Sequence, residues 1–314
     1  MAKSVASKGR TWQRFVKIYN RDKWLYLIIA IPIVWYLIFC YLPMYGVLLS
    51  VFDVRVFRSF AALTKGRFVG TKFFEQYLTD PYFWQLVRNT FALNIYDVIF
   101  GFPIPVIFAL MLNELQSNRF KKGIQTITYL PHFISTVVIC GIIRNFFSHD
   151  GLINDVIAKF GMERTNYLVQ ASMFRPIFVG SGIWQNFGWD SILYLAALTS
   201  VDPQLYEAAR LDGAGRFQQI RYIAFPSVLP TVTIMLIMRM GKLLSEGYTK
   251  ILLLYNGSTM EVADVIATYV YRQGLQGARF SYATAIGLFS SVVNLVLLVA
   301  TNTISRKVSD TSLW

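Results

Sequence analysis

The stretch WLYLIIAIPIVWYLIFCYLPMYGVLLSVF (residues 24–52) contains no Asp, Glu, Lys or Arg. About 20 consecutive, predominantly apolar residues are enough for a helix to cross the hydrocarbon core of a bilayer. The whole chain shares this bias, because 55% of its 314 residues are hydrophobic and only 15% are charged. Soluble domains are roughly one quarter charged. The sequence therefore predicts an integral membrane protein.

Five further apolar stretches of span length follow the first one. Two of them carry a single acid each, Asp97 and Asp190. Several contain proline or glycine, which neighbouring helices can accommodate in a membrane. We therefore expect an all-α integral membrane fold with six transmembrane helices in a single domain, residues 24–314. The expected spans are about 24–45, 89–113, 123–146, 174–198, 222–243 and 281–304.

Basic residues predict which ends of the spans face the cytoplasm, because Lys and Arg are enriched in short cytoplasmic loops. The N-terminal segment 1–23 and the loop 114–125 are both basic, and Arg306 and Lys307 follow the last span. This pattern places the N-terminus, the C-terminus and the loop 199–226 in the cytoplasm.

Motifs for catalysis and ATP hydrolysis are missing from the sequence. No G-x-x-x-x-G-K-[ST] phosphate loop occurs, and Gly213-x-Gly215 lacks the third glycine of a dinucleotide-binding fingerprint. The only histidines are His132 and His149, which do not form a His-x-x-x-His pair. We expect His132 to contact a neighbouring helix. The sequence thus indicates a protein that is not an enzyme and holds no cofactor or metal of its own.

The loop 199–226 has its own local signals. Asp202 and Pro203 predict a helix start, because Asp can cap free backbone N–H groups and proline is tolerated at the first helical position. Gly213 predicts the end of this helix, and a second helix is expected from Arg216. The charges of the loop cancel, whereas a helix on anionic lipid carries a basic excess. A surface for another protein and a solvated turn both fit this pattern.

The stretch EAARLDGAGRFQQIRYIAFP (207–226) resembles the EAA loop of binding-protein-dependent ABC importer permeases. The match lies in Glu207-Ala208-Ala209, Gly213 and Pro226, in the loop before the penultimate span. The order and spacing of FGFPIPVIFALMLNEL, TYLPHFISTVV and YATAIGLFSSVVNLVLL also resemble the maltose-type carbohydrate permeases. Within that group the chain is most similar to the branch associated with aldouronate, alginate and other complex oligosaccharides. The resemblance implies the type I ABC importer permease fold.

By this resemblance the loop is a coupling helix and turn that sits in a groove of a cytoplasmic ATP-binding subunit. Two copies of that subunit, a second homologous permease chain and an extracytoplasmic solute-binding protein complete the transporter. The resemblance places the transporter in the inner membrane of a bacterium. ATP and magnesium would be bound by the ATPase subunits, and closure of these two subunits would drive alternating access. The coupling residues that the resemblance implies are Glu207, Ala208, Ala209, Leu211, Asp212, Gly213, Ala214, Gly215 and Arg216.

Polar residues inside the expected spans are candidates for the substrate path, because polar groups in hydrocarbon are costly. Tryptophan rings near them are of the kind that pack on sugar rings. Hydrogen bonding between helices is the alternative role for each residue. The candidates are Asn94, Asp97, Trp184, Asn186, Trp189 and Asn294, with Asp190 beside them.

The charge of the external loops favours an acidic saccharide that contains uronate, such as alginate. The expected external segments 46–88, 144–175 and 239–279 carry more basic than acidic residues, and such an excess attracts anions. Lipid headgroups or an acidic binding-protein surface would explain the excess equally well. Two other classes stay open: an ion-gradient-driven secondary transporter with Asp97 in a proton relay, and a membrane scaffold or sensor subunit.

Overall fold

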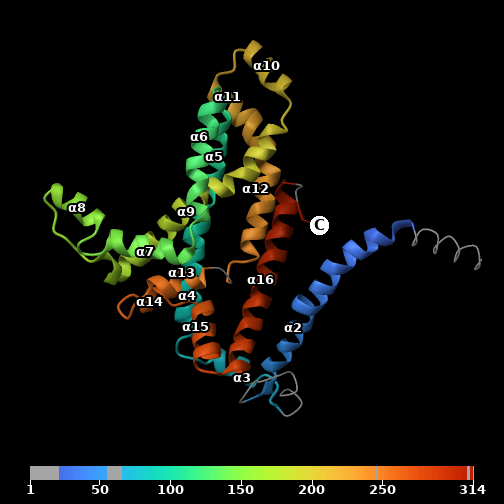
Figure 1. The fold of residues 1–314 in the computed structure, drawn as a ribbon, viewed down its shortest axis with the longest axis vertical. Coiled ribbons are helices and arrows are strands. Elements are labelled where there is room, and N and C mark those ends of the chain that lie inside the picture. The colour runs from blue at the N-terminus through green and yellow to red at the C-terminus, as the bar shows by residue number, and fades with distance from the viewer. Residues whose placement is uncertain (1–20, 55–65, 245–246, 310–311, 314) are drawn as a thin grey trace, which may run out of the picture.

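The structure, a computed structural model, describes residues 21–54, 66–244, 247–309 and 312–313. This part of the chain is almost entirely helical, as the apolar stretches predict, and forms an elongated body from which the N-terminal helix leans away (Figure 1). Its strands are β1 (Phe52–Asp53) and β2 (Arg67–Phe68), which pair antiparallel. Most of the basic segment 1–23 lies outside the described residues.

Four helical segments in the described part of the chain are long and apolar enough to cross a membrane. They lie over the first, second, fifth and sixth expected spans. These segments are Arg21–Ser50, Phe83–Asn113, Arg216–Met240 and Phe280–Lys307. Their elements are η1 (Leu37–Tyr41), α2 (Leu42–Met44) and η2 (Tyr45–Ser50); α4 (Phe83–Tyr96), η4 (Asp97–Gly101) and α5 (Pro103–Asn113); α11 (Arg216–Gln219), η7 (Ile220–Ala224) and α12 (Phe225–Met240); and α16 (Phe280–Ser309).

Three of these segments pass a proline in the same way. The wide π-helical turns η1, η4 and η7 each end two residues before a proline, at Pro43, Pro103 and Pro226 respectively. A proline cannot donate to the carbonyl four residues back, and its ring crowds that carbonyl. Because a wider turn moves this carbonyl aside, each helix continues past its proline.

The third expected span, 123–146, does not form one helix. Two helical pieces, Asn118–Phe133 and Thr136–Lys159, meet there at a bend of 97°. Ile134 has extended backbone, and Ser135 caps the following helix by accepting a hydrogen bond from the Val138 N–H at 3.4 Å. The sequence reading missed that Ser135 starts a new helix. The pieces comprise α6 (Asn118–Tyr129), η5 (Leu130–Phe133), α7 (Thr136–Phe147) and α8 (Leu152–Lys159).

The fourth expected span lies in α9 (Ala171–Thr199), a helix of 29 residues that follows η6 (Tyr167–Val169). Its length is sufficient, but Gln185, Asn186 and Asp190 make it less apolar than the four segments above. By length and composition the described residues thus contain four spans, or five if the bent pair is one span. The predicted number of six is not confirmed.

Helix α9 is the centre of the packing. At one end it joins α5 and α12 in a cluster that includes Val106, Leu195 and Val228. Nearer its start it packs with α7 and α13 through Ile177 and their buried residues. The shorter elements after α12 are α13 (Tyr248–Leu254), α14 (Met260–Ala263), α15 (Ile266–Tyr271) and η8 (Arg272–Gln276).

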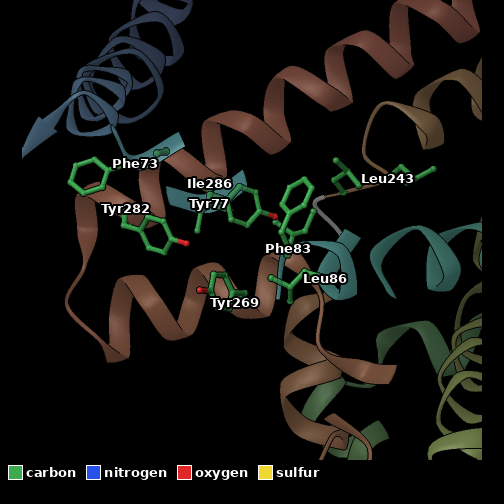
Figure 2. Packing of buried hydrophobic residues seen from close by; sticks show 11 residues of the cluster. Phe73, Tyr77, Phe83, Leu86, Leu243, Tyr269, Tyr282 and Ile286 are labelled. Atoms are coloured by element: carbon green, nitrogen blue, oxygen red, sulfur yellow. The ribbon is translucent and has the colours of Figure 1, made fainter. Parts of the chain in front are cut away.

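A third cluster closes the end of the molecule where α3 (Lys72–Leu78) lies, and Figure 2 shows its aromatic rings. Tyr77 packs edge-to-face on Phe83 with ring centroids 5.0 Å apart. The hydroxyls of Tyr269 and Tyr282 both donate to the same Asp80 oxygen, at 2.7 and 3.2 Å. These contacts tie α3, α15 and α16 together.

Candidate coupling loop and translocation cavity

The loop 199–226 stands at the end of the molecule opposite α3 (Figure 1). It contains α10 (Pro203–Leu211), which starts where the sequence predicts. The Asp202 carboxylate accepts a hydrogen bond from the Gln204 N–H at 2.9 Å and so caps the helix. Pro203 occupies the first helical position, where no N–H is needed.

The turn after α10 depends on a left-handed residue, Gly213, whose φ is +80°. Glycine adopts this conformation without steric cost. The side chains of two glutamines stabilise the turn. The Gly215 N–H donates to the Gln218 side chain at 2.7 Å, and the Gln219 amide donates to the Ala214 carbonyl at 2.9 Å. The turn therefore has a defined shape and leads directly into α11.

The nine predicted coupling residues lie together on this loop. Ala209 and Ala214 are half-buried, and the other seven are exposed. Two apolar side chains also project from it, with Leu211 90% and Phe217 77% exposed. Single exposed apolar residues are normal on protein surfaces, so the contact of this loop with another protein stays a prediction.

A second feature is a cavity of about 470 Å³ between the long helices. It is lined by α4, η4, α9, α12 and α13, so it lies among the second, fourth and fifth expected spans. Four polar residues that the sequence singled out line it together: Asn94, Asp97, Asn186 and Asp190. Its volume is within the range of small-ligand sites, about 300–1,000 Å³.

Three other path candidates do not line this cavity. The side chains of Trp184 and Trp189 are 44% and 40% exposed, on the outside of the described chain. Asn294 is buried, and its side-chain oxygen accepts a hydrogen bond from the Leu244 N–H at 3.0 Å. Asn294 thus holds the turn after α12 against α16.

His132 contacts α9, as expected. Its Nδ1 lies 3.0 Å from the Asn186 side-chain oxygen, and its ring stacks on Trp189 with centroids 4.5 Å apart. Asn186 therefore lines the cavity and also contacts His132 of the neighbouring helical segment. Among the described residues no group of three or more His, Cys, Asp or Glu is arranged to hold a metal ion.

The cavity also contains basic residues that the sequence reading did not assign to the path. Arg239, at the end of α12, donates from its Nε to the Asp97 carboxylate at 3.0 Å and forms an ion pair with it. Gly101 leaves room for that carboxylate, because a Cβ there would come within 2.7 Å of an Asp97 oxygen. Lys242 and Lys250 also line the cavity. From the sequence, Arg239 and Lys242 contribute only to the basic excess of the expected external segment 239–279.

Breaking the Asp97–Arg239 pair is expected to destabilise the fold. Both side chains are about 30% exposed or less, so Asp97→Asn should cost about 1–3 kcal/mol by leaving a partly buried cation unpaired. The double variant Asp97→Asn, Arg239→Gln should recover part of this loss. Thermal unfolding of the purified protein in detergent measures both effects, and a double variant less stable than Asp97→Asn would contradict the expectation.

Lys250 lies on α13, outside the candidate spans, and is 8% exposed. Its Nζ donates to the Phe178 carbonyl at 2.9 Å and lies 4.9 Å from the centroid of the Phe178 ring. Burial lowers the pKa of the Lys250 ammonium to about 8. Gly247, with φ of +87°, begins α13 and so places this lysine against α9.

The sequence profile of the family described as "Binding-protein-dependent transport system inner membrane component" matches residues 85–310. The chain belongs to this family. It is therefore a membrane component of a transport system, as the resemblance of the loop implied. The matched residues contain both the coupling loop and the cavity.

Two curated relatives from Bacillus subtilis (strain 168) match almost the whole permease. Protein LplB is 41% identical over 311 residues, which cover 99% of this chain and 96% of LplB. The polygalacturonan/rhamnogalacturonan transport system permease protein YteP is 38% identical over 295 residues, covering 94% of this chain and 91% of YteP.

Solved structures show the same fold. The permease is similar to a chain in the crystal structure of a bacterial ABC transporter involved in the import of the acidic polysaccharide alginate, with a TM-score of 0.85 and 41% identity. The match covers 94% of this permease and 99% of that chain. A second structure of an alginate ABC transporter, in complex with an alginate pentasaccharide-bound periplasmic protein, gives the same TM-score. The fold is that of a type I ABC importer permease.

Proposed function

We propose that this permease is the membrane subunit of an ATP-driven importer that moves an acidic oligo- or polysaccharide, such as alginate, across the bacterial inner membrane. The observation that carries this proposal is the charge of the cavity, where Arg239, Lys242 and Lys250 outnumber Asp97 and Asp190. The similarity to a chain of an alginate importer and to a polygalacturonan permease supports the same substrate class.

The coupling loop is the proposed entry point of the energy of ATP. Glu207 would meet a basic residue of an ATP-binding subunit, and Ala208 and Ala209 would permit close packing. Leu211, whose side chain is 90% exposed, would enter an apolar pocket of that subunit. A displacement at this contact would be transmitted inward, because the helical segment Arg216–Met240 runs from the loop to the cavity.

Alternating access follows if the loop moves with the ATPase subunits. At about 1.5 Å per residue a helix of this length spans more than 30 Å, so a tilt imposed at Arg216 displaces Arg239 at the other end. Such coupling requires that the ATPase contacts the loop differently in its two states. Substrate would enter the outward-facing state from a binding protein.

The complete transporter would contain this chain, a second homologous permease, two copies of a cytoplasmic ATP-binding subunit and an extracytoplasmic solute-binding protein. ATP and magnesium would be bound by the ATP-binding subunits. In this arrangement residues 24–314 form one transmembrane domain with six spans, and both termini and the loop 199–226 face the cytoplasm.

Reconstitution tests this proposal. Proteoliposomes with this chain, its partner permease and the ATP-binding subunits should take up a uronate oligosaccharide when ATP is enclosed on the cytoplasmic side and loaded binding protein is outside. Without ATP, uptake should fall to background. Uptake of neutral saccharides alone would contradict the acidic substrate class, and uptake driven by an ion gradient without ATP would contradict the importer.

The secondary transporter with Asp97 as a proton relay is not favoured by the geometry. The Asp97 carboxylate is an ion-pair partner of Arg239, and the matched family belongs to binding-protein-dependent transport. The same proteoliposomes, energised by a proton gradient in place of ATP, distinguish the two classes.

A further inference from the structure

Lys250 combines three properties that are costly together. Its side chain is buried, it lines the cavity, and no carboxylate among the described residues lies within 4.0 Å of its ammonium group. The one hydrogen bond that the structure gives to Nζ goes to the Phe178 carbonyl. An ammonium group has three donors, so two donors of this buried cation are left for another group.

The acids of the cavity do not pair directly with Lys250, and Asp97 attracts its charge only from beyond ion-pair distance. The Asp97 carboxylate is bonded to Arg239 through two of its guanidinium nitrogens. Asp190 and Lys242 each have interactions of their own. Lys250 is thus the cavity cation without a carboxylate in contact among the described residues, and a buried charge is stable only when it is paired or hydrogen-bonded.

We propose that the Lys250 ammonium binds a carboxylate of the transported saccharide and thereby selects uronate-bearing chains over neutral ones. This inference rests on the proposed function and assigns its substrate selectivity to one residue. The carboxylate would accept the two free Lys250 donors. Asn94 and Asn186, which line the same cavity, would hydrogen-bond sugar hydroxyls.

The position of Lys250 is fixed, which a selective site requires. The bond to the Phe178 carbonyl and the contact with the Phe178 ring hold the ammonium against α9. A Cβ at Gly182 would lie 3.5 Å from Nζ, so the absence of a side chain at this position of α9 leaves room for the lysine. The lowered pKa of Lys250 agrees with a desolvated cation that an anion would stabilise.

A purely structural role is the competing explanation, because the bond to Phe178 joins α13 to α9. The two roles differ in one measurable respect. Loss of a structural bond would impair the transport of every substrate equally, whereas loss of a carboxylate anchor would impair only substrates that carry a carboxylate.

The test uses the complete transporter in proteoliposomes and two substrates: a uronate oligosaccharide, and the same oligosaccharide with its carboxyl groups reduced to alcohols. Each variant is compared with the wild type for each substrate, so that any preference of the binding protein cancels. Lys250→Gln should lower kcat/KM for the uronate chain by about 10- to 100-fold, the loss expected for a hydrogen bond to a charged group. For the reduced chain the change should stay within about twofold.

Two further variants complete the test. Lys250→Arg keeps the charge and should retain the preference for uronate, and it decides the question if Lys250→Gln does not assemble. Lys159→Gln removes an exposed lysine on α8, outside the cavity, and should leave kcat/KM unchanged for both substrates. Equal losses for both substrates with Lys250→Gln, or loss of the preference with Lys250→Arg, would overturn the inference. A wild type that imports no uronate at all would instead show that the proposed function is wrong.

Discussion

Gly213→Pro is expected to abolish ATP-driven uptake while the chain still inserts into the membrane. Proline fixes φ near −65°, whereas Gly213 has φ of +80°. Proline also removes the N–H that donates to the Arg210 carbonyl at 3.1 Å. A penalty of about 3 kcal/mol would lower the population of the native turn about 100-fold, and uptake should fall accordingly.

The matched control for this variant is Gly215→Ala, two residues further along. Gly215 has φ of −70°, which any residue adopts, and the nearest atom to an added Cβ lies 3.8 Å away. This variant should keep the native turn, so a loss of uptake in Gly215→Ala would report on the packed surface of the loop and not on backbone strain. Glu207→Ala, which changes the exposed surface without straining the backbone, should also uncouple uptake. Wild-type uptake and ATPase stimulation in both Gly213→Pro and Glu207→Ala would refute the coupling role of the loop.

Gly188→Ala is expected to have the largest effect on folding. Gly188 is buried where α9 crosses α6, and a Cβ at this position would lie 2.2 Å from the Thr128 carbonyl oxygen. Since that obstacle is backbone, the two helices would have to move apart. Overpacking of this kind costs about 1–3 kcal/mol. We expect a lower melting temperature and a smaller yield of monodisperse protein by size-exclusion chromatography in detergent.

Gly180→Ala provides the control on the same helix. No atom lies within 4 Å of a Cβ at Gly180, and alanine favours a helix more than glycine does. This variant should be at least as stable as the wild type. If Gly188→Ala were equally stable, the close approach of α9 to α6 would be wrong.

Local signals explain which parts of the site were predictable. The Asp202 cap, the Pro203 start and the helix end before Gly213 depend only on neighbours in the chain, and the structure has each of them where the sequence predicts. The left-handed conformation of Gly213 is what the structure adds. The break at Ser135 was also a local signal, since serine is a preferred helix cap. It was overlooked because the apolar run continues through it.

The cavity could be predicted only in part. Intramembrane polarity selected Asn94, Asp97 and Asn186, which line the cavity, and their role in transport stays a prediction. Trp184 and Trp189 were chosen for their rings near these polar residues, and both lie partly exposed on the outside of the described chain. Position along a helix does not reveal how that helix is rotated about its axis. Lys250 carried no signal at all, since a single lysine beside apolar residues is typical of any loop near a membrane.

The sequence by itself determined the membrane character of the chain, its helical class and the start of the helix in the coupling loop, since these depend on composition and on residues close together in the chain. Only the tertiary structure decided which charges meet. Asp97 and Arg239 are 142 positions apart in the sequence, and Lys250 and Phe178, which are hydrogen-bonded, are 72 positions apart. Such contacts depend on how helices cross and rotate against one another, which residue spacing along each helix does not encode.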